Sequence, residues 1–173
     1  MKECTKIRMM QFKHSTHFLN NMTLKLIDEN ITPEEIRLLG KWRKKVQPAW
    51  GETFKITFKG TEKWIHGIID NPTKMLFFVM VKDKPIGHVG FDSTGVDLDE
   101  CFIGNIIRGK GKSDGSMIEA IKTLITIGKK FGHNVCLKTQ KNNIRAIQFY
   151  KKIGFRVYER INNDLIMKYV KSQ

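Results

Sequence analysis

Residues 106–116 read Ile-Ile-Arg-Gly-Lys-Gly-Lys-Ser-Asp-Gly-Ser, so that an apolar strand end runs directly into a glycine-rich turn. The residues after this turn place apolar or small side chains at helical spacing, as in a helix that packs on a sheet: Met117, Ile118, Ile121, Leu124, Ile125 and Gly128. The sequence therefore predicts a strand over residues 100–107, a sharp turn, and a helix that begins near Ser116.

Further strands and helices are predicted on both sides of this unit. Alternating or continuous apolar runs predict strands over residues 23–27, 75–81, 86–92, 135–139, 155–161 and 165–170. Capping residues and helical spacing predict helices over residues 33–45, 57–69 and 143–154. We expect turns at residues 82–85 and at Asn162-Asn163. This order of elements predicts a mixed α/β layer.

Size and composition indicate one globular domain. The chain has 173 residues, of which 40% are hydrophobic and 28% charged, and this argues against disorder, collagen-like repeats and a coiled-coil rod. We predict a single domain over residues 22–173, preceded by a polar arm or edge element over residues 1–21. No apolar run approaches the roughly 20 residues of a membrane span, and the N-terminus lacks the pattern of a secretory signal.

The cysteines indicate the cellular compartment of the protein, and its net charge indicates the class of its binding partners. Cys4, Cys101 and Cys136 cannot all pair and are too widely spaced for a metal knuckle, so we expect free thiols, no metal site and a reducing cytoplasmic location. The formal net charge of +14 favours anionic partners such as nucleic acid, phosphate or carboxylate. The oligomeric state stays open, a homodimer included.

The glycine-rich turn is a candidate phosphate site. Its glycines let the backbone approach a ligand, its cationic side chains attract a pyrophosphate, and amides at the start of the following helix can donate to phosphate oxygens. The candidate binding residues are Arg108, Gly109, Lys110, Gly111, Lys112, Ser113, Gly115 and Ser116. The alternative is a flexible basic loop. Neither GxxxxGK[ST] nor GxGxxG is present, so the turn predicts a different phosphate-bearing ligand.

A second motif occupies residues 143–155, Asn-Ile-Arg-Ala-Ile-Gln-Phe-Tyr-Lys-Lys-Ile-Gly-Phe. Asn143 caps a helix, Ala146 leaves room for a ligand against its first turn, and Tyr150 projects about two turns later. Together with the glycine-rich turn, this motif resembles the GNAT superfamily of acetyl-CoA-dependent N-acetyltransferases. The corresponding family helix reads Asn-x-x-Ala-x-x-x-Tyr followed by Gly-Phe, and it is matched here by Asn143, Ala146, Tyr150, Gly154 and Phe155.

The resemblance extends over about residues 22–170 and implies the family fold, a mixed and mostly antiparallel sheet of six to seven strands flanked by about four helices. The family turn Arg/Gln-x-x-Gly-x-Gly/Ala is matched by Arg108-x-x-Gly111-x-Ser113, with serine at the last small position. Trp42-Arg43 and Trp64 look like the N-terminal helices of ribosomal-protein and amino-sugar acetyltransferases. Alternatively, the two tryptophans only pack these helices onto the sheet.

The resemblance also implies roles in acetyl transfer. A backbone N–H at Ile106 or Ile107 would polarise the thioester carbonyl of acetyl-CoA, the co-substrate, and the same strand would pair with the pantetheine arm. Tyr150 would protonate the leaving thiolate, since reference phenol and thiol pKa values of about 10 and 8.5 lie close together; the alternative for Tyr150 is a core aromatic.

Two residues are candidates for the base that deprotonates the amine. Glu100 is the first choice, because even spacing along one strand predicts that it shares a sheet face with Ile106. The alternative for Glu100 is an exposed carboxylate in a turn. His88 is the second choice, on a mostly apolar strand, and its alternative is a core histidine.

Charge discriminates among acceptors. A nucleotide-linked deoxyamino sugar carries a pyrophosphate that a basic protein attracts, whereas a polycationic aminoglycoside would be repelled. We therefore expect N-acetylation of such a sugar in surface-glycan synthesis. The runner-up is Nα-acetylation of a protein or peptide of the ribosomal type. A third hypothesis, a non-enzymatic nucleic-acid-binding domain, is weakened because no helix gathers the basic residues into one stripe.

Overall fold

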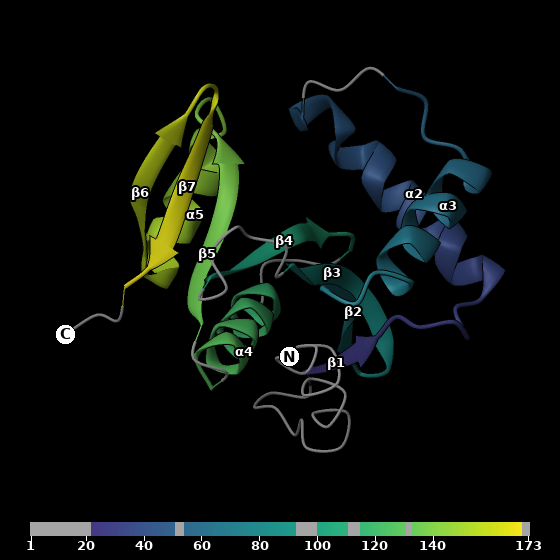
Figure 1. Cartoon of the computed structure of the whole chain (residues 1–173). Coiled ribbons are helices and arrows are strands. Elements are labelled where there is room, and N and C mark those ends of the chain that lie inside the picture. The colour runs from purple at the N-terminus through teal and green to yellow at the C-terminus, as the bar shows by residue number, and fades with distance from the viewer. Residues whose placement is uncertain (1–21, 51–53, 93–99, 111–114, 131–132, 171–173) are drawn as a thin grey trace.

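The structure, a computed structural model, describes residues 22–50, 54–92, 100–110, 115–130 and 133–170. A seven-stranded sheet with strand order β1-β2-β3-β4-β5-β7-β6 forms the centre of the molecule (Figure 1). Strands β4 and β5 pair in parallel, and each of the other neighbouring strands pairs in antiparallel fashion. The predicted fold class, a mixed and mostly antiparallel sheet with flanking helices, is confirmed. The predicted arm over residues 1–21 lies outside the described residues.

The elements lie close to their predicted positions. The strands are β1 (Met22–Leu26), β2 (Lys74–Val81), β3 (Lys84–Asp92), β4 (Glu100–Arg108), β5 (Asn134–Gln140), β6 (Phe155–Ile161) and β7 (Asp164–Tyr169). The helices of the described residues are α2 (Pro33–Val46), α3 (Phe58–Ile69), α4 (Ser116–Lys130) and α5 (Ile144–Ile153), with a 3-10 turn η2 (Gln47–Trp50).

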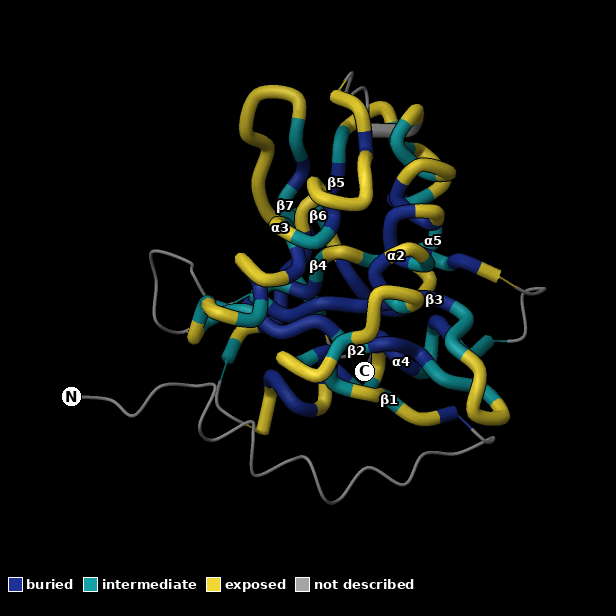
Figure 2. Tube along the Cα trace, turned by 90° about the vertical axis from the view of Figure 1, so that its right-hand side faces the viewer, coloured by how far each residue is buried: buried dark blue, intermediate teal, exposed yellow. Residues whose placement is uncertain are grey.

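Helices cover both faces of the sheet and divide the core in two. Helices α2 and α3 pack on one face, where Trp42, Ile65 and Phe78 belong to one buried cluster. Helix α4 packs on the opposite face with the larger cluster, which includes Ile103 and Leu124. The central strands are accordingly the most continuously buried part of the trace (Figure 2). Burial on both faces explains why β2 reads as an unbroken apolar run.

Local sequence explains where the helices begin and end. Thr32 and Glu35 form a capping box at the start of α2, where Pro33 occupies the first turn. Asn143 caps α5 with its side chain, and Gly154 ends this helix in a left-handed conformation with φ 115°. A residue with a Cβ is disfavoured at that φ, so glycine fits the end of the helix.

The turn between β2 and β3 is tighter than expected. Residues 82–85 are predicted to form this turn, but only Lys82 and Asp83 adopt positive φ angles, of 48° and 58°, and β3 already begins at Lys84. Pro85 lies inside the strand, opposite Met80, at a register shift. A shift of this kind accommodates proline, because proline has no backbone N–H to donate to the ladder.

Candidate active site

The parallel pair at the centre of the sheet separates along its length. Residues Glu100–Phe102 of β4 pair with Asn134–Cys136 of β5, and the register between these strands goes no further. Beyond Phe102 and Cys136, the described backbone groups on the facing edges have no ladder partner across the gap. Such groups need hydrogen-bond partners, so an extended ligand with amide groups can pair with the edge of β4. This arrangement fits the pantetheine arm of a coenzyme.

A bulge lies in β4 beside this separation. Gly90 of β3 pairs with Gly104 and His88 pairs with Ile107, so Val89 alone faces two residues of β4. Asn105, at the bulge, has φ 49°, a conformation that asparagine tolerates better than most residues. The Gly104-Asn105 pair is the signal in the sequence that could have predicted this bulge.

The bulge corrects one prediction about the face of β4. Glu100 and Ile106 are predicted to share a sheet face, but Ile106 packs on the α4 side, whereas Ile107 joins the cluster under α2 and α3. Cys101, next to Glu100, also belongs to the α4 side, so the Glu100 side chain lies on the opposite face. The prediction was wrong because one inserted residue reverses the alternation of side chains after Gly104.

Two backbone amides of the turn after β4 donate hydrogen bonds to strand β3. The amides of Gly109 and Lys110 both donate to the Ile86 carbonyl oxygen, at 2.8 and 2.9 Å. These two candidate residues therefore have backbone donors that are already engaged, although the Lys110 side chain is exposed. Arg108, which ends β4, is half-buried. The candidates Gly111, Lys112 and Ser113 lie outside the described residues.

Helix α4 begins where the predicted phosphate site ends. Gly115 has φ 84°, and its carbonyl oxygen accepts from the Glu119 amide at 3.0 Å. Amides that precede Glu119 in the first turn, starting at Ser116, have no acceptor within the helix itself. A helix start of this kind attracts anions, and the first turn lies at the carboxyl end of β4, beside the separated strands.

Helix α5 supplies the second motif. The Asn143 side chain accepts from the Ala146 amide at 3.2 Å, which confirms the predicted cap. Tyr150 is half-buried and packs edge-on against Phe149 and Phe155, with ring centroids 5.6 and 6.2 Å away. Burial raises the pKa of the Tyr150 phenol to about 12, so the hydroxyl stays protonated at neutral pH. Ile147 is buried, although the sequence pattern did not single it out.

Glu100 lies at the closed end of the separation. Its side chain is 22% exposed, and its Oε1 is 3.9 Å from Nζ of Lys168 on β7. The buried Cys136 thiol is close by, and its pKa is raised to about 11 by burial and by the Glu100 charge. Lys168 could not be predicted from the sequence, because the sheet order, not the chain order, brings β7 next to β5.

His88 occupies the core under α2 and α3. The ring is 0% exposed, with centroids 6.1 Å from Trp42 and 6.2 Å from Trp64. Burial lowers the pKa of His88 to about 4; the Asn105 main chain acts in the opposite direction, and the Arg43 charge lowers the pKa further. Neither ring nitrogen has a partner with hydrogen-bond geometry among the described residues. The Arg43 guanidinium lies 4.2 Å from the Trp64 ring centroid, a cation-π contact that sequence reasoning did not foresee.

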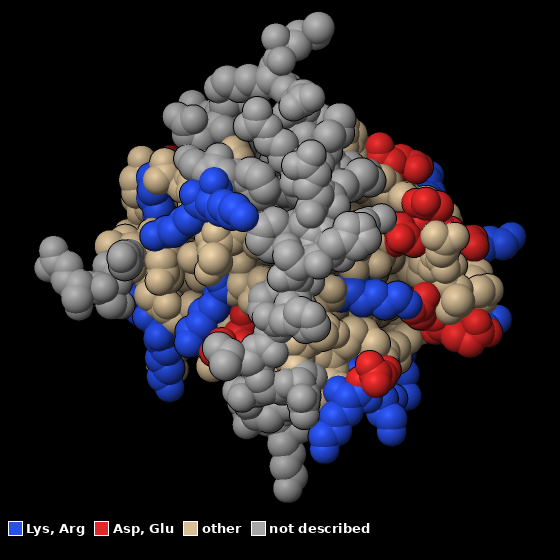
Figure 3. All heavy atoms as spheres, turned by 90° about the horizontal axis from the view of Figure 1, so that it is seen from below, with Lys and Arg blue, Asp and Glu red and all other residues tan. Residues whose placement is uncertain are grey.

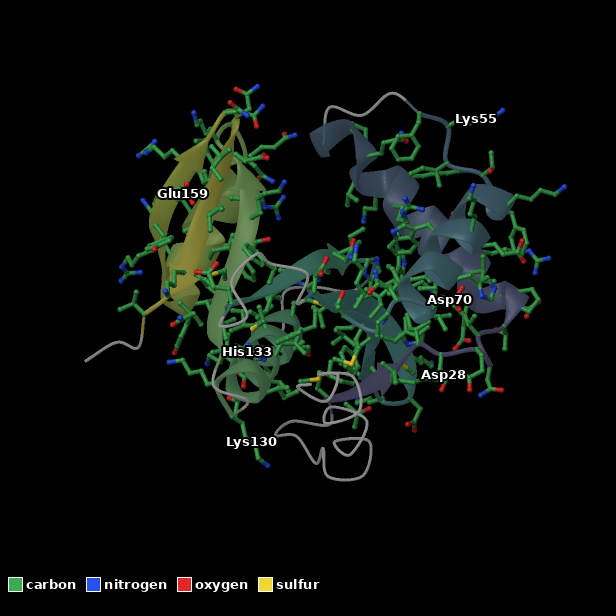
Figure 4. All side chains as sticks on the ribbon, in the orientation of Figure 1. Asp28, Lys55, Asp70, Lys130, His133 and Glu159 are labelled. Carbon is green, nitrogen blue, oxygen red and sulfur yellow. The ribbon has the colours of Figure 1, made fainter. Side chains whose placement is uncertain are left out.

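Two arms stand on either side of β4 (Figure 1). One arm consists of β5, β7, β6 and α5, and the other of α2 and α3. Figure 4 shows their side chains, with Glu159 on the first arm and Lys55, just ahead of α3, on the second. Glu100 comes from β4 between the arms, Tyr150 from the first arm, and His88 from under the second. His88 thus pairs with Ile107 in the carboxyl half of β4, whereas Glu100 begins this strand at its amino end.

The acetyltransferase (GNAT) domain family matches residues 28–156 of the sequence. The chain belongs to the GNAT acetyltransferase family. It is therefore an enzyme that uses acetyl-CoA and acetylates an amine, which confirms the predicted family, fold and enzyme class. The matched region contains the separated strands, the turn before α4 and the whole of α5.

Solved GNAT structures share this fold at low sequence identity. The N-acetyltransferase PseH of Campylobacter jejuni, in complex with acetyl coenzyme A, has a TM-score of 0.66 and 20% identity over 87% of this chain and 99% of that one. FdhC, a nucleotide-linked sugar GNAT, has a TM-score of 0.68 and 16% identity over 87% and 86%. RimL, a ribosomal L7/L12 alpha-N-protein acetyltransferase bound to coenzyme A, has a TM-score of 0.68 and 17% identity over 87% and 93%.

No curated protein sequence matches the chain. Within the described part of the chain, no helix is both long and apolar enough to cross a membrane. The same residues contain no group of three or more His, Cys, Asp or Glu side chains that could hold a metal ion.

Proposed function

We propose that this GNAT enzyme transfers the acetyl group of acetyl-CoA to a primary amine on a nucleotide-linked deoxyamino sugar, in surface-glycan synthesis. The separation of β4 from β5 after Phe102 and Cys136 supports the coenzyme half of this proposal. The net charge of +14 supports an anionic acceptor. The structural neighbour FdhC is a nucleotide-linked sugar GNAT, so this class of acceptor is the first to test.

The coenzyme would bind along β4 and the start of α4. Its pantetheine arm would pair with the free edge of β4 near Ile106 and Ile107. Its diphosphate would take hydrogen bonds from the first turn of α4, from Ser116 onward, with Gly115 allowing close approach. Arg108, Lys110 and Lys112 would add positive charge, and Asn143 and Ala146 would shape the α5 side.

Acetyl transfer needs a polarised carbonyl, an acid and a base. A backbone N–H at the β4 bulge would polarise the thioester carbonyl, because a fixed donor aimed at developing charge lowers the barrier. Tyr150 would protonate the departing thiolate; its raised pKa keeps the phenol protonated at neutral pH, and it also makes the phenol a weaker acid relative to a thiol of pKa about 8.5. Glu100 would accept the proton of the amine through a chain of water molecules, because its half-buried side chain lies at the amino end of β4, away from the bulge.

The distribution of charge bears on the acceptor. Seen from below, acidic side chains gather toward the side of α2 and α3, and lysine and arginine side chains lie on both sides of the molecule (Figure 3). On the other arm, Lys138 and Lys168 project from the face of the sheet opposite α4. A polycationic amine would gain little from such a surface, whereas a sugar diphosphate would gain long-range attraction.

A panel of acceptors tests this proposal. Acetyl-CoA in excess is mixed with the enzyme and UDP- or TDP-linked amino sugars, and released CoA is measured with a thiol reagent. The matched controls are the same nucleotide sugars with a hydroxyl in place of the amine. CoA release that needs the amine supports the proposal. No release from any sugar, with release from other amines, would refute the sugar assignment.

A second candidate is Nα-acetylation of a protein or peptide. The likeness to RimL, at a TM-score of 0.68, favours including it. Peptides with a free amino terminus, and the same peptides formylated there, are therefore added to the panel. CoA release with free peptides alone would promote this candidate. For either acceptor we place the reaction in the cytoplasm, since the buried thiols Cys101 and Cys136 are unpaired.

A further inference from the structure

His88 lies directly beside the bulge of β4. It pairs with Ile107, the first residue after the bulge, and Gly90 pairs with Gly104, the last residue before it. The side chain therefore points to the face of α2 and α3 at the position where β4 carries its extra residue. The rings of Trp42 and Trp64 enclose it, so its orientation is restricted by packing.

A buried ring with unpaired nitrogens is costly unless a partner is within reach. Both ring nitrogens of His88 are buried without a hydrogen-bond partner among the described residues. The Asn105 main chain stabilises the protonated ring. Of the main-chain groups of Asn105, only the carbonyl oxygen can accept from an imidazole N–H, so this carbonyl is the group that would bond to the ring, although no such bond is formed in the structure. A small movement of this peptide would complete the bond and satisfy one nitrogen.

The direction of the Asn105 carbonyl fixes that of the next amide. In a trans peptide, the C=O of one residue and the N–H of the following residue point in opposite directions. When the Asn105 carbonyl faces His88 on β3, the Ile106 N–H points away from β3. The other neighbour of β4 is β5, and the two strands no longer pair at this level. In that arrangement the Ile106 amide would point toward the gap between them.

We propose that His88 is a positioning residue, which holds the Asn105 peptide so that the Ile106 N–H points at the thioester carbonyl of acetyl-CoA. This rests on the proposed coenzyme site between β4 and β5. This role makes the amide of Ile106, and not that of Ile107, the donor to the thioester carbonyl. An enclosed ring such as His88 can perform it without contacting the substrate. The base for the amine would then be another group.

The surroundings of the ring suit a donor that stays neutral. Arg43 of α2 is the charged residue that acts on His88, and it disfavours a second positive charge there. Trp64 of α3, Phe78 of β2 and Ile107 of β4 present no titratable group. A neutral imidazole keeps one N–H, which is sufficient for one hydrogen bond to the carbonyl.

The test measures the thioester carbonyl of bound acetyl-CoA by infrared difference spectroscopy, with a ¹³C label at that carbon and no acceptor present. His88→Phe keeps an aromatic ring and removes the donor; His88→Gln restores an N–H donor; His88→Leu is a second variant without a donor, should His88→Phe not fold. We expect a lowered carbonyl frequency in the wild type and in His88→Gln, and a smaller shift in His88→Phe or His88→Leu.

Binding and turnover complete the test. Acetyl-CoA affinity should change by less than about threefold in the variants, whereas kcat should fall about tenfold to a hundredfold without the donor and recover in His88→Gln. A full carbonyl shift and full kcat in a folded variant without the donor would overturn the proposal, as would a His88→Gln variant that behaves like His88→Phe. A wild-type carbonyl with no shift would also overturn it. If the wild type does not bind acetyl-CoA, the coenzyme site itself fails, and the positioning role with it.

Discussion

Trp42 of α2 and Gly109 of the turn after β4 are in such close contact that a Cβ added to Gly109 would lie 1.9 Å from Cε2 of Trp42. The indole is 2% exposed and also meets Phe78 edge-on, at 6.1 Å between ring centroids. The ring therefore cannot retreat without disturbing the core. The start of the proposed phosphate site thus rests directly on α2, a helix of the second arm.

Gly109→Ala should destabilise the protein by about 2 kcal/mol or more, because overpacking a fixed aromatic ring forces backbone movement. Gly67→Ala is the matched control: it lies in α3, and an added Cβ there meets nothing within 4 Å. This control should be neutral or stabilising by roughly 0.5–1 kcal/mol. The urea midpoint of unfolding measures both, and equal midpoints would contradict the contact.

Tyr150→Phe should lower kcat by about a hundredfold while leaving acetyl-CoA affinity nearly unchanged, because the ring packing is kept and only the hydroxyl, the proposed acid, is lost. With a pKa of about 12, Tyr150 should cause no loss of kcat between pH 7 and roughly pH 11. Tyr169→Phe is the control, since Tyr169 packs against the same Phe155 ring at 5.6 Å. Unchanged turnover in Tyr150→Phe would remove Tyr150 as the acid.

The stability of the protein should fall in mild acid because of His88. Its pKa is about 4 in the folded protein, against the 6.5 of an ordinary solvent-exposed histidine, so the unfolded chain binds the proton first as pH falls. The free energy of unfolding should therefore be highest above pH 6.5 and decrease by on the order of 3 kcal/mol as pH falls to 4. Denaturant titrations at several pH values measure this. His88→Phe should flatten the dependence of the unfolding free energy on pH between 4 and 6.5, whereas the control His66→Gln, at an exposed position, should leave it unchanged. If both variants show the same slope, His88 is not its cause.

Glu100→Gln should lower kcat by about tenfold or more at neutral pH with little change in acetyl-CoA binding, because it removes the proposed base without changing the size of the side chain. Asp164→Asn is a suitable control: its carboxylate pairs with Lys138 at 3.2 Å, and it lies on β7 of the first arm, opposite Gln140. If both variants retain full turnover, another group or ordered water is the base.

Much of the architecture could be predicted from local patterns. Helix α2 begins at Pro33 after the cap Thr32, α3 begins at Phe58 after the cap Thr57, and α4 begins at Ser116 after Gly115. These signals act over only a few residues. Residues 143–155 carry enough of the family helix for the fold to follow from resemblance. Lys84 and Pro85 are predicted to lie in a turn because proline usually interrupts a strand, whereas the register shift beside Met80 accommodates it.

The sequence alone determined the types of the elements, the caps of α2 and α5, and the basic net charge. It also suggested the GNAT family through residues 143–155. Each of these depends on composition or on residues close together in the chain. Only the tertiary structure decided which side chains face each other. The bulge at Asn105 reversed the faces of Ile106 and Ile107, the sheet order brought Lys168 to Glu100, and the packing of two tryptophans enclosed His88. These relationships depend on strand register and on long-range packing, where one inserted residue changes the face of every residue that follows.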